Sequence, residues 1–135
     1  LAASAGAATS NITPPTAPPI EVSAVAASPQ LSTLVRDANG IAAGGIRLPA
    51  VAVPTALNTG ENQAGTPAND LSAFCTLFGG HVPFDAARVQ AMYQSRDAYR
   101  RAVRLVVEGL VKQGFVLAAD ASTLVRNADA SYAVK

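Results

Sequence analysis

The sequence predicts an α/β chain in which a short hairpin and irregular segments precede two or three helices. Two observations support this expectation. Asn39-Gly40 separates two apolar runs, and Asn-Gly is the strongest short signal for a hairpin turn. From Asp97 to Gln113 apolar residues recur every three or four positions, which is the spacing of one face of a helix. The first half of the chain is therefore expected to be extended and the second half helical.

Residues 1–30 are expected to contain the end of a helix and a proline-rich strap. Leu1–Ala8 is rich in alanine, the best helix former. Residues 14–19 include four prolines, which exclude helix and favour extended chain. From residue 20 to residue 24 apolar and polar side chains alternate, which predicts a short strand that can pair with the next segment of the chain.

Residues 31–57 are expected to form a hairpin that presents the run GGIRLPAVAVP at positions 44–54. Its strands are Leu31–Arg36 and the chain from Ile41 onward. Two adjacent glycines give the run backbone freedom, and its two prolines fix φ angles. Between the prolines, Val51–Val53 is expected to be extended, with its two valines on one face.

Residues 58–83 are expected to be a long loop followed by an aromatic segment. Asn58–Asp70 is rich in Asn, Gly, Thr and Pro and has no apolar period, which is typical of loops. Phe74–Phe84 contains three of the four phenylalanines of the chain and is expected to enter an apolar groove. Cys75, the only cysteine, is expected to be a small buried residue.

Residues 84–135 are expected to form the C-terminal helices. Asp85 can cap a helix over Ala86–Gln94, because an aspartate side chain accepts hydrogen bonds from the first free N–H groups. Gly114 follows the strongly periodic helix at the position where a left-handed C-cap belongs. Asp120 can cap the last helix.

The chain has little bulky apolar material from which to build a core. Of its 135 residues, 29 are Ala, whereas Val, Leu, Ile and Phe together supply 33. Ten glycines, nine prolines and the absence of Trp indicate much irregular chain. We therefore expect that the polypeptide is not self-sufficient and that all four segments are one part of a larger domain.

Charge and hydropathy exclude two classes of partner. A formal net charge of +1 with 14% charged residues argues against a nucleic-acid surface, because phosphate neutralisation needs clustered Lys and Arg. Arg, Glu or Pro interrupts each apolar run well before the roughly 20 residues that a bilayer span needs. We expect a soluble chain with no membrane span. The first residue is Leu1 and not methionine, from which we expect a cleaved, truncated or mature terminus.

Few residues are candidates for catalysis, and no metal or cofactor is expected. The pentapeptide G-x-S-x-G of a nucleophilic serine does not occur, and the carboxylates show no ligand spacing. His81 is the single imidazole and the one catalytic candidate. Since the chain offers it no nucleophile, the simpler interpretation is a histidine that bonds to backbone or faces a cleft.

The candidate substrate-binding residues are Arg47, Asn62 and His81. Arg47 can meet an anion together with Gly44-Gly45. It can equally pair with a carboxylate and hold two segments together. A further charge cluster is expected to be a solvated helix face, formed by Arg96, Arg100, Arg101 and Arg104.

Four segments carry a resemblance to a known family: Pro14–Val22, Asp37–Gly40, Gly44–Pro54 and Gly79–Asp85. Their order resembles the C-terminal region of a bacterial α/β-hydrolase-domain family. There a Pro-rich segment precedes an Asp-x-x-Gly turn, a GG-[IV]-R-x-P-x-V-x-V-P motif and a G-x-x-x-PF-[DS] motif. The resemblance covers nearly the whole chain, and GG-[IV]-R-x-P is its most specific part.

The resemblance implies that this chain is the C-terminal portion of an α/β-hydrolase-like fold. In that family the serine, the acid and the histidine precede this region, and relatives usually have a small or polar residue where His81 stands. The implied function is a C-terminal part or processed subunit of a serine ester or amide hydrolase. It would complete the fold and line or cover the pocket. The implied partners are the upstream catalytic part or large subunit and a small-molecule ester or amide substrate.

The alternative is a non-catalytic binding or structural module that packs on a partner chain. The sequence leaves the compartment open between the bacterial cytoplasm and the periplasm or secretion.

Overall fold

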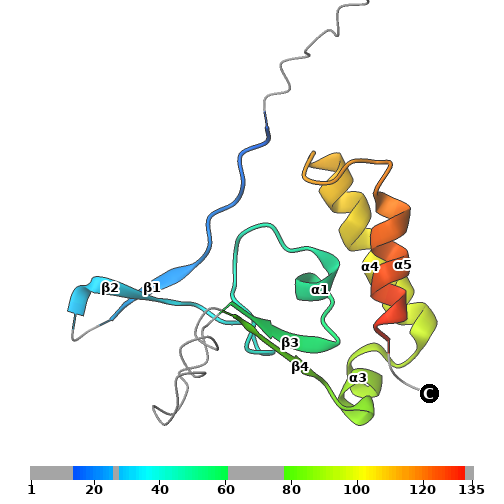
Figure 1. Ribbon diagram of the computed structural model, residues 1–135, viewed down its shortest axis with the longest axis horizontal. Helices are drawn as coiled ribbons and strands as arrows, with labels where there is room; N and C mark the ends of the chain where they lie inside the picture. Colours follow the sequence, from blue (N-terminus) through cyan, green and yellow to red (C-terminus); the bar gives the residue numbers. More distant parts are fainter. Residues whose placement is uncertain (1–13, 26–27, 61–77, 133–135) are drawn as a thin grey trace, which may run out of the picture.

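The computed structural model describes residues 14–25, 28–60 and 78–132. The elements within these residues are β1 (Val22–Val25), β2 (Ser28–Leu34), α1 (Pro49–Ala52), β3 (Ala56–Thr59), β4 (Gly80–Pro83), α3 (Ala86–Tyr93), α4 (Arg96–Lys112) and α5 (Ala121–Ala130). β1 pairs with β2, and β3 with β4, both antiparallel. In Figure 1 the β1–β2 ribbon lies on one side and the α4–α5 pair on the other, with α1 and the β3–β4 pair between them.

The strap and both arms of the hairpin exchange backbone hydrogen bonds where the β1–β2 ribbon joins the rest of the molecule. The expected pairing of the strap strand is confirmed, since Val22 lies opposite Leu34. Beyond that pair, Val35 N donates to Glu21 O (3.0 Å) and Glu21 N donates to Ala43 O (3.1 Å). Ala43 N in turn donates to Val35 O (2.8 Å). Each of the three segments therefore bonds to the other two.

The return strand expected from Ile41 onward is shorter than expected. It is reduced to isolated bridges at Ala42 and Gly44, and Gly44 pairs with Ile20 of the strap rather than with β2. Gly44 has a φ of 74°, and a Cβ at this position would collide with the backbone oxygen of Pro19. Glycine is therefore required for the strap to approach so closely and take over the pairing.

Two further boundaries in the extended half are wrong. β2 begins at Ser28, three residues before the expected strand start. Asn58–Thr59 belongs to β3 and not to the expected loop, because it pairs with Gly80–His81 of β4. This pairing between distant segments overrides the loop-like local composition.

The aromatic segment is buried only in part. Phe84 is 9% exposed, whereas Phe78 is 60% exposed, so the expected entry into an apolar groove is wrong for Phe78. The expected helix end at Leu1–Ala8, the candidate Asn62 and the expected burial of Cys75 lie outside the described residues.

The Asn39-Gly40 turn is confirmed. Asp37 Oδ1 accepts hydrogen bonds from Asn39 N (2.9 Å) and Ile41 N (3.1 Å), and Gly40 N donates to Asp37 O (2.9 Å). The φ of 81° at Gly40 is one that glycine adopts without strain. The turn delivers Ile41 to a buried position, 2% exposed.

The extended conformation expected for Val51–Val53 is wrong, because residues 49–52 form the single helical turn α1. Pro49 occupies its first position, where the fixed φ suits a helix and the missing N–H has no intrahelical partner to lose. Leu48 before it is extended, with φ −63° and ψ 163°. Val53 after it is 6% exposed and joins the core.

The core is centred on α4. Tyr99, Val103 and Val107 are 1%, 1% and 2% exposed, and the ring centroids of Tyr93 and Tyr99 lie 5.0 Å apart. The buried cluster is completed by Val53, Phe84, Val89 and Tyr132. The helix predicted over Asp97–Gln113 is thus confirmed to within one residue at each end, and its apolar face is the buried one.

In the described part of the chain, no helix is long and apolar enough to cross a membrane.

Side-chain caps begin two of the helices. Asp85 Oδ1 accepts from Arg88 N (2.7 Å) at α3, as expected, and Ser95 Oγ accepts from Ala98 N (3.1 Å) at α4. Asp120 precedes α5, but its side chain makes no capping hydrogen bond. That expectation is wrong because the backbone of Asp120 is helical (φ −90°, ψ −14°), whereas a side-chain cap is typically made from an extended residue.

The C-terminal end of α4 is closed by Gly114, as predicted. Gly114 has a φ of 80° and donates its N–H to Val111 O (3.0 Å), while Phe115 N donates to Leu110 O (2.9 Å). These two bonds are the Schellman pattern, which satisfies carbonyls that the helix leaves free.

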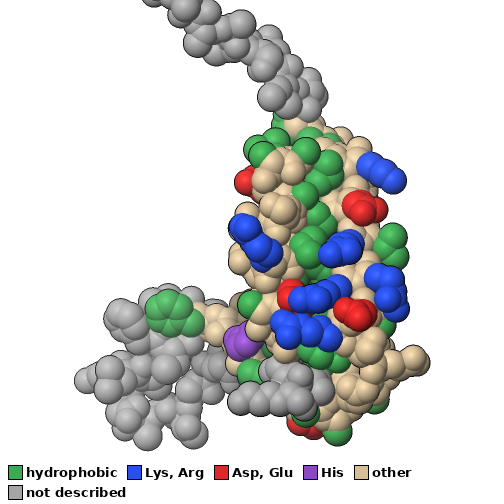
Figure 2. Space-filling view, turned by 90° about the vertical axis from the view of Figure 1, so that its right-hand side faces the viewer, with side chains coloured by type: hydrophobic (Ala, Val, Ile, Leu, Met, Phe, Trp, Pro, Cys, Tyr) green, Lys and Arg blue, Asp and Glu red, His purple; other side chains and the backbone are tan. Residues whose placement is uncertain are grey.

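A carboxylate between two arginines holds α5 against α4. Asp129 Oδ1 accepts from Arg96 Nε (2.8 Å), and Asp129 Oδ2 accepts from Arg100 Nη2 (2.6 Å). The expected solvated face is confirmed in part for these two arginines, whose side chains are 51% and 41% exposed but which also join the two helices. It holds for Arg101 and Arg104, which are exposed. Figure 2 shows basic side chains gathered over this face of the molecule, with acidic ones among them.

We predict that Asp129→Asn makes the protein less sensitive to acid. Hydrogen bonds from Arg100 and Arg96 hold the pKa of Asp129 well below its usual 3.8. The unfolded chain therefore takes up the proton first, so this stabilisation is complete above about pH 4 and is lost as pH falls toward the folded pKa. Thermal melting measured between neutral pH and pH 2 should show a shallower acid loss for the variant. Glu108→Gln, at an exposed position on α4, is the control, and equal acid losses in D129N and wild type would contradict the prediction.

Candidate functional site

A cavity of about 390 Å³ lies between α1, β3, β4, α4 and α5. We call it the His81 cavity. Its apolar lining consists of Leu48, Pro49, Ala50, Ala56, Leu124 and Ala128. Its polar lining consists of Thr55, Asn58, His81, Tyr99, Asn127 and Ser131. Among the described residues, no Asp, Glu, Lys or Arg lines the cavity.

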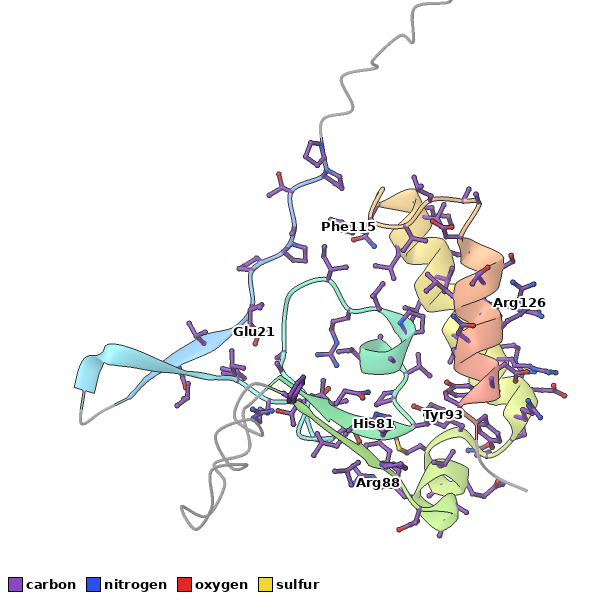
Figure 3. All side chains as sticks on the ribbon, viewed as in Figure 1. Glu21, His81, Arg88, Tyr93, Phe115 and Arg126 are labelled. Carbon is purple, nitrogen blue, oxygen red and sulfur yellow. The ribbon has the colours of Figure 1, made fainter. Side chains whose placement is uncertain are left out.

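His81 is held in a defined orientation by Asn58, which lies directly opposite it in the β3–β4 pair. Asn58 Nδ2 donates to Ala50 O of α1 (3.0 Å), and this bond leaves Asn58 Oδ1 facing His81 Nδ1 at 2.7 Å. Because an amide oxygen can only accept, Nδ1 is the donor, and in the tautomer with its hydrogen on Nδ1 the other nitrogen, Nε2, is an acceptor. Figure 3 labels His81 on β4, and the purple histidine in Figure 2 is at the surface.

The Ser131 hydroxyl belongs to a separate network. Ser131 Oγ donates to Ala128 O (2.6 Å) and accepts from Thr55 Oγ1 (3.2 Å). Tyr99 OH donates to Ala128 O (3.0 Å), and burial raises the pKa of Tyr99. In the described part of the chain, no hydrogen bond joins Ser131 to His81. Among the described residues that line the cavity, Ser131 is therefore not activated by His81.

Arg47 pairs with Asp37, which is the second of its two sequence interpretations. Arg47 Nη2 lies 2.6 Å from Asp37 Oδ2 and donates to Val51 O (3.0 Å), while Nη1 donates to Ala42 O (2.6 Å). Burial opposes ionisation of Asp37, but hydrogen bonds from Arg47 and from two backbone N–H groups outweigh it and lower the pKa of Asp37. We call this arrangement the Arg47 clamp, because it joins the turn, the chain after it and α1.

The two candidates that the structure describes, Arg47 and His81, line different cavities. Arg47 lines a second cavity, of about 370 Å³, together with Pro18 of the strap and Leu105 of α4. This cavity shares no lining residue with the His81 cavity, and Asn62 lies outside the described residues. Within the described ranges, no group of three or more His, Cys, Asp or Glu could hold a metal ion.

The sequence did not identify Asn58 or Ser131 as neighbours of a candidate site. Asn58 reaches His81 across 23 positions, so only the pairing of β3 with β4 reveals the contact. Ala56–Thr59 reads ALNT and shows no alternation of apolar and polar residues, and four residues are too few to separate a strand from a loop.

Residues 7–126 match the α/β hydrolase domain family. The chain belongs to this family. The match includes Asn58 and His81 and ends before Asn127 and Ser131 of the His81 cavity. No curated protein and no solved structure matches the chain. In α/β hydrolases the nucleophile stands in G-x-S-x-G, a pentapeptide that this member of the α/β hydrolase domain family lacks in its 135 residues.

We predict that Arg47→Ala lowers both the thermal stability of the protein and its activity, and that the loss of activity is no larger than the loss of stability explains. The substitution leaves Asp37 without its cation and two carbonyls without a donor, which should cost about 1 to 3 kcal/mol. Melting curves and activity of the assembled protein measure the two effects. Arg101→Ala, at an exposed position on α4, is the control. A selective rise in KM with unchanged melting would instead assign Arg47 to substrate binding.

Proposed function

We propose that this chain is the C-terminal part or a processed subunit of a serine ester or amide hydrolase. In this role it completes the α/β fold and lines or covers the substrate pocket. The observation that carries the proposal is the family match over residues 7–126 in a chain without a G-x-S-x-G pentapeptide. The catalytic serine, acid and histidine then come from an upstream part or large subunit, and the substrate is a small ester or amide.

Exposed apolar side chains on the β1–β2 ribbon support a contact with such a partner. Val22 and Leu34 lie directly opposite each other and are 58% and 40% exposed. Ile20, two positions before Val22 and 57% exposed, continues the same face. Contiguous apolar exposure of this kind marks protein contacts. In the proposal these residues pack on the upstream part, and the segments 1–30, 31–57, 58–83 and 84–135 act as one part of its domain.

The Arg47 clamp supports an architectural role for the GGIRLP stretch. The guanidinium is occupied by Asp37 and two backbone carbonyls. Its role in the proposed hydrolase is therefore to fix the shape of this stretch, and substrate contacts come from other residues.

We predict that the chain co-purifies with a larger polypeptide that contains a reactive serine. That serine should be labelled by a fluorophosphonate probe, since such probes modify serines activated by a base. Native mass and size-exclusion chromatography of the purified sample measure the association. A stable, folded 13.7 kDa monomer without a companion would contradict the proposal.

We predict that His81→Ala in the assembled protein reduces kcat/KM by less than about tenfold, near 1.4 kcal/mol of barrier. The reason is that loss of a general base typically costs about 100-fold or more. Steady-state kinetics with a chromogenic ester measures the effect. A loss of several hundredfold with unchanged melting would identify His81 as catalytic and overturn the assignment of the triad to the partner.

A non-catalytic binding module is the second candidate function. The His81 cavity favours it, because a pocket with apolar walls and an oriented acceptor can bind a molecule without a nucleophile. The fluorophosphonate experiment separates the two functions, since a binding module needs no companion with a reactive serine.

A further inference from the structure

We infer that the His81 cavity binds a small uncharged molecule that carries an alcohol O–H on an apolar body. This binding site is formed by the cavity itself and does not require the proposed catalytic partner.

The size and the walls of the cavity set the body of the ligand. A volume of about 390 Å³ lies toward the lower end of the roughly 300 to 1,000 Å³ range of ligand pockets, so it suits a small molecule. Leu48 and Pro49 beside α1 and Leu124 of α5 contribute apolar surface. An apolar body gains free energy by leaving water for such walls.

The described lining of the cavity disfavours ions as ligands. No charged side chain among the described residues lines the cavity. A carboxylate or an ammonium group would lose its hydration there without meeting an opposite charge, which is costly. An uncharged polar group avoids this cost.

The orientation of His81 selects a hydrogen-bond donor. Because Ala50 O fixes the Asn58 amide and Asn58 Oδ1 faces His81 Nδ1, the tautomer with its hydrogen on Nδ1 leaves Nε2 as the acceptor of a residue that lines the cavity. A hydroxyl hydrogen can be donated to this atom, whereas a ketone or an ether has no hydrogen to donate. Asn58 is accordingly a positioning residue, since it acts on the ligand through the imidazole.

The test begins with the tautomer and with three matched probes. His81 is the only histidine of this chain, so long-range ¹H–¹⁵N spectra of the ¹⁵N-labelled full chain, combined with any unlabelled companion that co-purifies, contain one pair of labelled imidazole nitrogens. We expect the tautomer that carries its hydrogen on Nδ1. Benzyl alcohol should bind saturably and shift the Nε2 resonance, and it should bind more tightly than toluene or benzoate, which lack the uncharged O–H.

Variants then test the contact. His81→Phe keeps a ring of similar size but has no acceptor, and loss of one hydrogen bond predicts about two- to tenfold weaker binding of benzyl alcohol. Asn58→Leu removes the acceptor at Nδ1, so His81 should lose its preference for one tautomer and benzyl alcohol should bind more weakly. Asn58→Asp retains an acceptor and should restore the hydrogen on Nδ1. Val82→Thr is the matched control, because Val82 is the exposed neighbour of His81 on β4 and does not line the cavity.

Four results would overturn the inference: protonation at Nε2, equal affinity for toluene and benzyl alcohol, tighter binding of benzoate, or unchanged affinity in H81F. Thermal melting shows whether each variant is folded, and His81 is exposed, so H81F is expected to fold. None of these outcomes depends on a reactive serine, so failure of the binding site and failure of the hydrolase proposal are distinguishable.

Discussion

The placement of α1 depends on one guanidinium. Arg47 bonds to the Asp37 carboxylate of the turn, to Ala42 O of the chain after the turn and to Val51 O of α1. A single helical turn does not persist by itself, because nucleation fixes several residues for few hydrogen bonds. The hydrogen bond from Arg47 to Val51 O helps to hold α1 in its helical conformation. α1 in turn forms one wall of the His81 cavity. The two glycines before Arg47 let the chain pass close to the strap on its way to this position.

The parts of the fold that follow local rules could be predicted from the sequence. α4 was predicted because its apolar residues recur at helical spacing and its buried face is the apolar one. The caps at Asp85 and Gly114 were predicted because each depends on one residue type and its immediate neighbours. α1 was not predicted, because alternating alanines and valines also fit a strand. Pro49 is compatible with an extended run as well as with the first position of a helical turn.

The candidate site could be predicted only in part, because its contacts join distant segments. His81 was recognised as a candidate since it is the only imidazole. Its partner Asn58 lies in a stretch whose composition predicts a loop, and no local pattern marks Ser131. The role of Arg47 was foreseen as one of two possibilities, and only the position of Asp37 in the folded chain decides between them. Packing between elements therefore determined the site more than any motif did.

Two neighbouring carbonyls of α1 have different partners, since Ala50 O accepts from Asn58 and Val51 O accepts from Arg47. The same helical turn therefore supports both the imidazole and the Asn39-Gly40 hairpin turn. Thermodynamic linkage requires that any coupling between two such sites be reciprocal. A ligand in the cavity that restricts the motion of α1 therefore stabilises the Asn39-Gly40 turn. Stabilisation of that turn strengthens ligand binding by the same free energy.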